Sequence, residues 1–234
     1  MSKTTNNLTV LDDIPLELDL PAVQQRLRMR NDSQRIRDMI SELVTQVNSV
    51  ARPKVVYKVS QAAGDKNRKA VEIDGVEMVS YISTLSFSQG ETVFPYVATC
   101  GVEVDVLKTE SGDFMRRYCL NIIKELVLRA ASKYLHEHLM SSYQLTEITR
   151  VAPGEALGPL TQQRQLFSIL GDVEGYIGVR LTDHNMMVPE KSSSGVFFET
   201  AVKLESCQLC PDMKCSGRRF PFEPELAEIH HSGA

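Results

Sequence analysis

Residues 150–198 decide the fold, and they read RVAPGEALGPLTQQRQLFSILGDVEGYIGVRLTDHNMMVPEKSSSGVFF. In order, this stretch contains a strand end, a tight Pro-Gly turn, an apolar helical segment, a second apolar run, a loop with two methionines and a proline, and a serine run that opens a last strand. A bend beside a single arginine suits a small anionic ligand, since glycine lets the backbone approach closely and a guanidinium forms two parallel hydrogen bonds with a carboxylate. We therefore expect an anion site at Arg150 and the turn around Pro153.

Several short motifs in and before this stretch carry a family likeness, and their order and spacing are more specific than any one of them. They are Arg150-x-Ala152-x-Gly154, Ile177-Gly178-Val179 followed by Leu181-Thr182, Met187-x-Pro189, Ser192-x-Ser194-Gly195, and the upstream Tyr134-Leu135-His136-Glu137 and Ala98-Thr99-x-Gly101. Together they resemble the activation domain of cobalamin-dependent methionine synthase, the module that binds S-adenosylmethionine. The resemblance covers roughly residues 95–198, and more loosely the whole chain.

The resemblance implies a role for four residues of the cofactor site. Arg150 would hold the methionyl carboxylate of S-adenosylmethionine, and the backbone around Ala152 and Gly154 would meet the adenosine. Glu155 stands where the family has a tyrosine, so it either replaces an acidic contact beside the cationic ligand or is solvated. The family's Asp-Trp-x-Pro-Phe-Phe motif and its later tyrosine have no counterpart here.

Length and composition indicate one domain, residues 1–234, of a soluble protein. The 234 residues are 42% hydrophobic, which is enough for a buried core, and the net charge of −4 argues against nucleic acid as a partner. The first residues lack the apolar core of a signal peptide, and no apolar run is long enough to span a membrane. We expect a cytoplasmic protein, with residues 1–18 partly flexible and 200–234 forming a cysteine-containing extension.

Apolar spacing and turn residues predict an α+β fold, in which helices flank a mainly antiparallel, twisted sheet. Pro95 indicates that one strand lies at an edge of the sheet or ends there. Helices are expected from Leu20, over 33–51 and over 114–140, and strands over 55–59, over 71–78 with a break at Asp74-Gly75, and over 92–99.

Three cysteines near the C-terminus, Cys207, Cys210 and Cys215, form the pattern C-x-x-C-x-x-x-x-C. Thiolates at this spacing can converge on one zinc ion or on an iron–sulfur cluster, with His230, His231 or an outside ligand in a fourth position. The alternative is three separate thiols, of which the first two form a redox pair. The methionine synthase domain lacks these cysteines, so local spacing alone supports this metal site.

Two hypotheses about function follow. In the first, the chain is a free-standing S-adenosylmethionine-binding accessory module for reductive reactivation or methyl transfer in a cobalamin-dependent methyltransferase system of methionine biosynthesis. A corrinoid-carrying motif, Asp-x-His-x-x-Gly, is missing, so the cobalamin would belong to a partner protein and catalysis would need that partner. In the second, the chain no longer binds S-adenosylmethionine and is a metal- or iron–sulfur-containing electron-transfer or docking subunit of a corrinoid protein.

Overall fold

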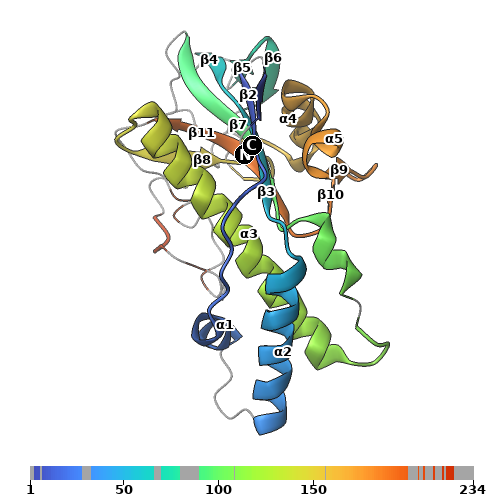
Figure 1. Cartoon of the computed structure of the whole chain (residues 1–234). Helices are drawn as coiled ribbons and strands as arrows, with labels where there is room; N and C mark the ends of the chain where they lie inside the picture. The colour runs from blue at the N-terminus through green and yellow to red at the C-terminus, as the bar shows by residue number, and fades with distance from the viewer. Residues whose placement is uncertain are drawn as a thin grey trace.

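The fold is a mixed α+β arrangement built on a mainly antiparallel sheet, as the sequence predicts (Figure 1). The computed structural model describes residues 3–5, 7–27, 33–65, 70–79, 90–107, 109–155, 157–199, 205, 208, 213, 218 and 220–223.

Nine strands of the described chain form the main sheet, and each recorded pairing is antiparallel. These strands are β1 (Lys3–Thr5), β2 (Leu8–Leu11), β3 (Lys54–Lys58), β4 (Ser60–Asp65), β5 (Ala70–Ile73), β6 (Val76–Val79), β7 (Glu91–Thr99), β8 (Ile148–Val151) and β11 (Ser192–Glu199). A separate pair contains β9 (Arg180–Leu181) and β10 (Met187–Val188). The predicted hairpin turn at Asp74-Gly75 joins β5 to β6.

Strand β7 is the centre of the sheet, so the expectation of an edge or an end at Pro95 is wrong. On one side β11 pairs with β7 along residues 93–99. On the other side the partner changes from β3, whose pairing stops at Tyr96, to β4, whose pairing starts at Val93. Pro95 falls in the gap between these partners, and a residue without an N–H is tolerated where that side of the ladder is interrupted.

Residues 8–11 form a strand where the polar N-terminus predicts a frayed end. Leu11 and Val10 are buried, and β2 pairs with β3 over its whole length. Two apolar side chains covered by neighbouring elements are enough to hold this short segment in the sheet.

Helices are present at the predicted positions, from Leu20, over 33–51, over 114–140 and after the Pro-Gly turn, and three further short helices in the described chain were not predicted. They are α1 (Leu20–Leu27), α2 (Gln34–Val50), α3 (Phe114–Tyr143), α4 (Gln163–Leu170) and α5 (Val173–Ile177), with the short 3₁₀ helices η1 (Val102–Val106) and η2 (Leu160–Gln162). The carboxylate of Asp113 caps α3 by accepting a hydrogen bond of 2.9 Å from the Arg116 N–H. None of the helices in the described part of the chain is long and apolar enough to cross a membrane.

The helices cover the sheet on two faces and extend beyond it (Figure 1). The second half of α3 packs on one face, where Leu135 and Leu139 join Tyr57 and Phe197 in one buried cluster. Helices α4 and α5 pack on the opposite face. The first half of α3 continues past the sheet and packs with α1 and α2 in a helical lobe.

A partly buried polar network ties α3 to the sheet through His138. The hydroxyl of Tyr57 on β3 lies 2.9 Å from His138 Nε2 and 3.3 Å from the Tyr143 hydroxyl. The Ser142 hydroxyl lies 3.5 Å from His138 Nδ1, and the ring of Tyr134 stacks on the imidazole. Burial lowers the pKa of His138 and raises the pKa of Tyr57, so both groups are held neutral.

We expect the free energy of unfolding to fall on acidification through the region just below the ordinary histidine pKa of about 6.5. A lowered pKa in the folded state means that the unfolded chain binds the proton first. The contribution of His138 is therefore present above that pH and is lost as the pH falls toward the lowered folded value. Urea unfolding of the wild type and of His138→Gln at several pH values measures how much His138 contributes to the pH dependence of the unfolding free energy. A variant with the same pH slope as the wild type in this window would contradict the assignment.

Candidate functional site

The turn after β8 has the conformation that the Pro-Gly sequence predicts. Glu155 N–H donates a hydrogen bond of 3.1 Å to the Ala152 carbonyl, which closes a four-residue turn. Gly154 has φ of 83°, the positive value that a type II turn requires at its third residue, with Pro153 before it. The tight Pro-Gly turn that the sequence predicts is therefore present, with its glycine in the left-handed region.

Further hydrogen bonds hold the loop that follows the turn. The Gly154 N–H donates to the Gly158 carbonyl at 2.8 Å, and the Leu157 N–H donates to the Ala152 carbonyl at 3.1 Å. The side-chain amide of Gln162 donates to the Leu157 carbonyl at 2.6 Å and is buried. The backbone of the turn is therefore in place before any ligand arrives.

Arg150 projects from β8 onto the face of the sheet that α3 covers. It lies opposite Phe197 of β11, and its Nη1 donates to the Tyr96 hydroxyl at 3.4 Å. Its Nη2 donates to both carboxylate oxygens of Glu155, at 3.0 and 3.2 Å. The Arg150 side chain is 30% exposed and that of Glu155 is 39% exposed, so solvent reaches the pair.

The electrostatics of this site keep the guanidinium charged. Interaction with Tyr96 raises the pKa of Arg150, burial opposes this, and the Glu155 carboxylate raises the pKa further. Glu155 has a defined partner in Arg150, and its side chain is also partly exposed to solvent. An internal carboxylate already lies on the arginine, in the place where a ligand carboxylate would be expected.

Aromatic and polar side chains from β7, β11 and α3 gather around Arg150. The Tyr96 ring stacks on Phe197 with centroids 5.0 Å apart, and its hydroxyl lies 3.4 Å from Ser193 Oγ. The ring of His136, from the Tyr-Leu-His-Glu segment of α3, meets Phe197 edge-on at 6.0 Å. Residues far apart in the sequence therefore converge on one site.

Gly195 makes this arrangement possible by having no side chain. A Cβ there would lie 2.5 Å from the Val151 carbonyl oxygen and 3.2 Å from Cε1 of Tyr96. The Ser-x-Ser-Gly motif thus allows β8, β11 and the Tyr96 ring to approach closely. Tyr96 itself was not predicted as a site residue, because a tyrosine inside an apolar strand looks like core.

The predicted metal site lies outside the described residues, because Cys207, Cys210 and Cys215 are not among them. Within the described ranges there is no group of three His, Cys, Asp or Glu side chains that could hold a metal ion. Cys100 and Cys119 are free, buried thiols. Burial raises the pKa of Cys100 to about 11, so this thiol is protonated at neutral pH.

The sequence matches no model of a known protein family, and comparison with curated proteins finds no match either. The fold does match a solved structure, the crystal structure of the MetH reactivation domain bound to AdoHcy. The TM-score is 0.59 at 14% identity, over 82% of this chain and 78% of that one. At such low identity the likeness establishes a shared fold, and it confirms the predicted fold class.

Replacing Gly154 by alanine should destabilise the protein by about 1–2 kcal/mol, the cost of a left-handed conformation for a residue with a Cβ. The added methyl group would lie 3.5 Å from Cδ1 of Leu160, an ordinary contact, so backbone strain alone causes the loss. Urea unfolding measures the change. Asparagine tolerates positive φ better than alanine, so Gly154→Asn should lose less stability; an alanine variant as stable as the wild type would exclude the strain.

Proposed function

We propose that this chain binds S-adenosylmethionine beside Arg150 as an accessory module of a cobalamin-dependent, methionine synthase-type methyltransferase system. The observation that carries the proposal is the fold shared with a reactivation domain that was crystallised with AdoHcy. The half-buried guanidinium beside a preformed glycine turn supports the same position for the ligand. Ala152 and Gly154 would present backbone to the adenosine.

The charges of the site match those of the ligand. S-adenosylmethionine carries a carboxylate, an ammonium group and a sulfonium, and the site offers one cation and one anion that pair with each other. On binding, Arg150 would take the ligand carboxylate, and Glu155 would turn to the positively charged part. Glu155 lies on a solvent-accessible turn, so its side chain can make this exchange.

The corrinoid in this proposal belongs to a partner protein. The partner's corrinoid would supply the acceptor for the sulfonium methyl group, and S-adenosylhomocysteine would be left beside Arg150. The contribution of this chain is to hold the donor in one orientation, since positioning two reactants removes an entropic barrier. Metal binding by Cys207, Cys210 and Cys215 stays a separate proposal that rests on their spacing.

Arg150→Ala should weaken S-adenosylmethionine binding by about 1.5–3 kcal/mol, the range for a hydrogen bond to a charged group. This corresponds to roughly a ten- to a hundredfold rise in Kd. Calorimetric titration measures it. Arg180→Ala, at an exposed arginine on β9, is the matched control and should bind like the wild type. Equal affinity of Arg150→Ala and wild type would place the ligand elsewhere, and no binding by the wild type at millimolar ligand would reject the proposed function.

Glu155→Gln tests the second half of the charge exchange. If the carboxylate meets the cationic part of the ligand, the variant should bind S-adenosylmethionine about tenfold more weakly, since an isosteric amide removes the charge but keeps the shape. The same calorimetric titration applies. Tighter binding by the variant would instead mean that Glu155 competes with the ligand carboxylate for Arg150, and would contradict the exchange.

A further inference from the structure

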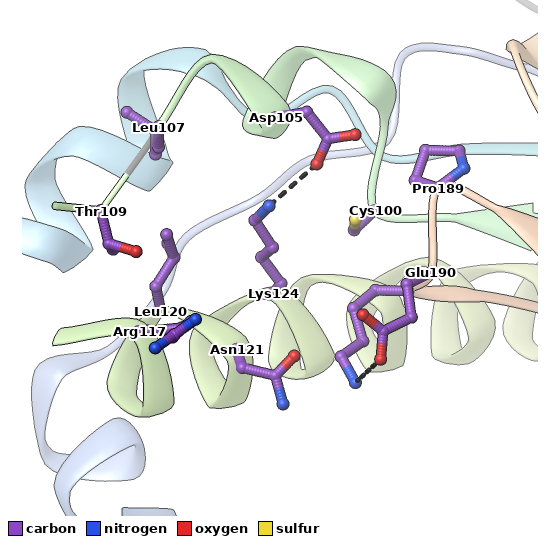
Figure 2. A pocket seen from close by; sticks show the side chains of 11 residues that line it. Cys100, Asp105, Leu107, Thr109, Arg117, Leu120, Asn121, Lys124, Pro189 and Glu190 are labelled. Atoms are coloured by element: carbon purple, nitrogen blue, oxygen red, sulfur yellow. Dashed lines mark hydrogen bonds and ion pairs between the residues drawn. The ribbon is translucent and has the colours of Figure 1, made fainter. Parts of the chain in front are cut away.

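A cavity of about 400 Å³ lies where the end of β7, η1, the first half of α3 and residues 189–191 meet. It is lined by Cys100, Asp105, Leu107, Thr109, Arg117, Leu120, Asn121, Lys124, Pro189, Glu190 and Lys191 (Figure 2). A volume of this size can hold most of a small-molecule ligand. Ser192, at the cavity end of β11, is five residues from Phe197, which faces Arg150; at about 3.3 Å per residue the two positions are roughly 17 Å apart.

The cavity is rich in cations that are more enclosed than their partners. Lys124 forms an ion pair of 2.9 Å with Asp105, and Lys191 lies 3.7 Å from Glu190. The lysine side chains are 17% and 20% exposed, whereas the carboxylates are 54% and 82% exposed. The positive ends therefore lie in the cavity wall, while water screens the negative ones.

Arg117 adds a third cation at the mouth of the cavity. It forms no ion pair with any residue that the structure describes, and its guanidinium lies 5.0 Å from the centre of the Phe114 ring. The five charged side chains that line the cavity thus carry one positive charge in excess. Thr109 and Asn121 add uncharged hydrogen-bond donors, and Leu107, Leu120 and Pro189 add apolar surface.

Backbone contacts hold the cavity wall in place. The Cys100 N–H donates to the Lys191 carbonyl at 3.0 Å, and Ser192 Oγ donates to the Pro189 carbonyl at 2.8 Å, so the segment with Lys191 is held on both sides. Gly101 makes the bend beneath it with φ of 92°, at a point where a Cβ would collide with the Arg52 carbonyl. The Ala98-Thr99-x-Gly101 motif, which the Arg150 site leaves unused, therefore shapes this cavity.

We propose that this cavity binds a small molecule that carries a phosphate group on an apolar body. Cations reach it from two sides, α3 and the segment before β11, and Asn121 and Thr109 add uncharged donors to the same lining. A phosphate has three acceptor oxygens and up to two negative charges, so it satisfies such a set better than a planar carboxylate does. The apolar body would lie against Leu107, Leu120 and Pro189.

The test is an NMR titration of the full chain with phenyl phosphate, inorganic phosphate and benzoate at constant ionic strength. Phenyl phosphate should shift the amides of the lining residues in a saturable way and bind most tightly of the three probes. Benzoate keeps the ring and replaces the phosphate by a carboxylate, so it should bind most weakly. Equal or tighter binding of benzoate would overturn the phosphate assignment, and no saturable shift with phenyl phosphate up to about 10 mM would overturn the site.

Variants at two cations of the cavity lining, Arg117 and Lys191, separate a built site from general charge attraction. Arg117→Gln and Lys191→Gln should each raise the Kd for phenyl phosphate about tenfold or more, as expected for loss of a charge-assisted hydrogen bond. The control is Lys133→Gln. Lys133 lies on α3, like Arg117, and its side chain is 77% exposed, so this variant should leave the Kd for phenyl phosphate unchanged. The same loss in all three variants would mean nonspecific attraction and would contradict the proposal. Because these probes do not involve Arg150, the result is independent of S-adenosylmethionine binding.

Discussion

The antiparallel ladder between β7 and β11 is the constraint on which both proposed sites depend. Its register runs from Ser192 opposite Thr99 to Phe198 opposite Val93. Since opposite residues of a strand pair point to the same face, this register decides which side chains meet under α3. A shift by one residue would turn Phe197 away from α3 and would separate Tyr96 from Arg150.

The close approach at Gly195 explains why this register tolerates a buried tyrosine next to an arginine. Gly195 lies opposite Tyr96, and the missing side chain leaves space for the aromatic ring to lie against β11. The ring stacks on Phe197 and brings its hydroxyl within reach of both Ser193 and Arg150. The phenol oxygen thereby accepts a hydrogen bond from the partly exposed guanidinium and helps to fix Arg150 on this face of the sheet.

The sequence predicts those parts of the structure that depend on local patterns. The helical spacing in α3, the turn at Gly154 and the serine run that opens β11 are each visible within a few residues, and each is present. The position of β7 at the centre of the sheet, by contrast, does not follow from a local pattern. Pro95 predicts an edge or an end, and only the tertiary arrangement shows a central strand whose partner on one side changes at this residue.

The residues of the candidate sites also fall into two groups, those that a local sequence pattern indicates and those that only the tertiary arrangement brings together. Arg150 and Gly154 stand out because arginine beside a Pro-Gly turn is a local pattern, and their contact with Glu155 follows from the turn itself. The contribution of Tyr96 depends on strand pairing across more than 50 residues of sequence, so no local signal indicates it. The cavity beside Lys124 is even harder to predict from the sequence than the role of Tyr96. Its lining comes from four separated segments, and their charges look like an ordinary solvated surface in the sequence.

The positions of the two sites along the same strand pair have an electrostatic consequence. At physiological ionic strength the Debye length is about 8 Å, and the sites are separated by roughly twice that distance. A charge bound beside Lys191 is therefore largely screened from Arg150. Energetic coupling between two binding sites needs a structural element with two alternative arrangements. The β7–β11 ladder is continuous and has a single register, so it offers one arrangement. In the two proposals each site binds according to its own contacts, and the ladder between them sets the distance between the two positions.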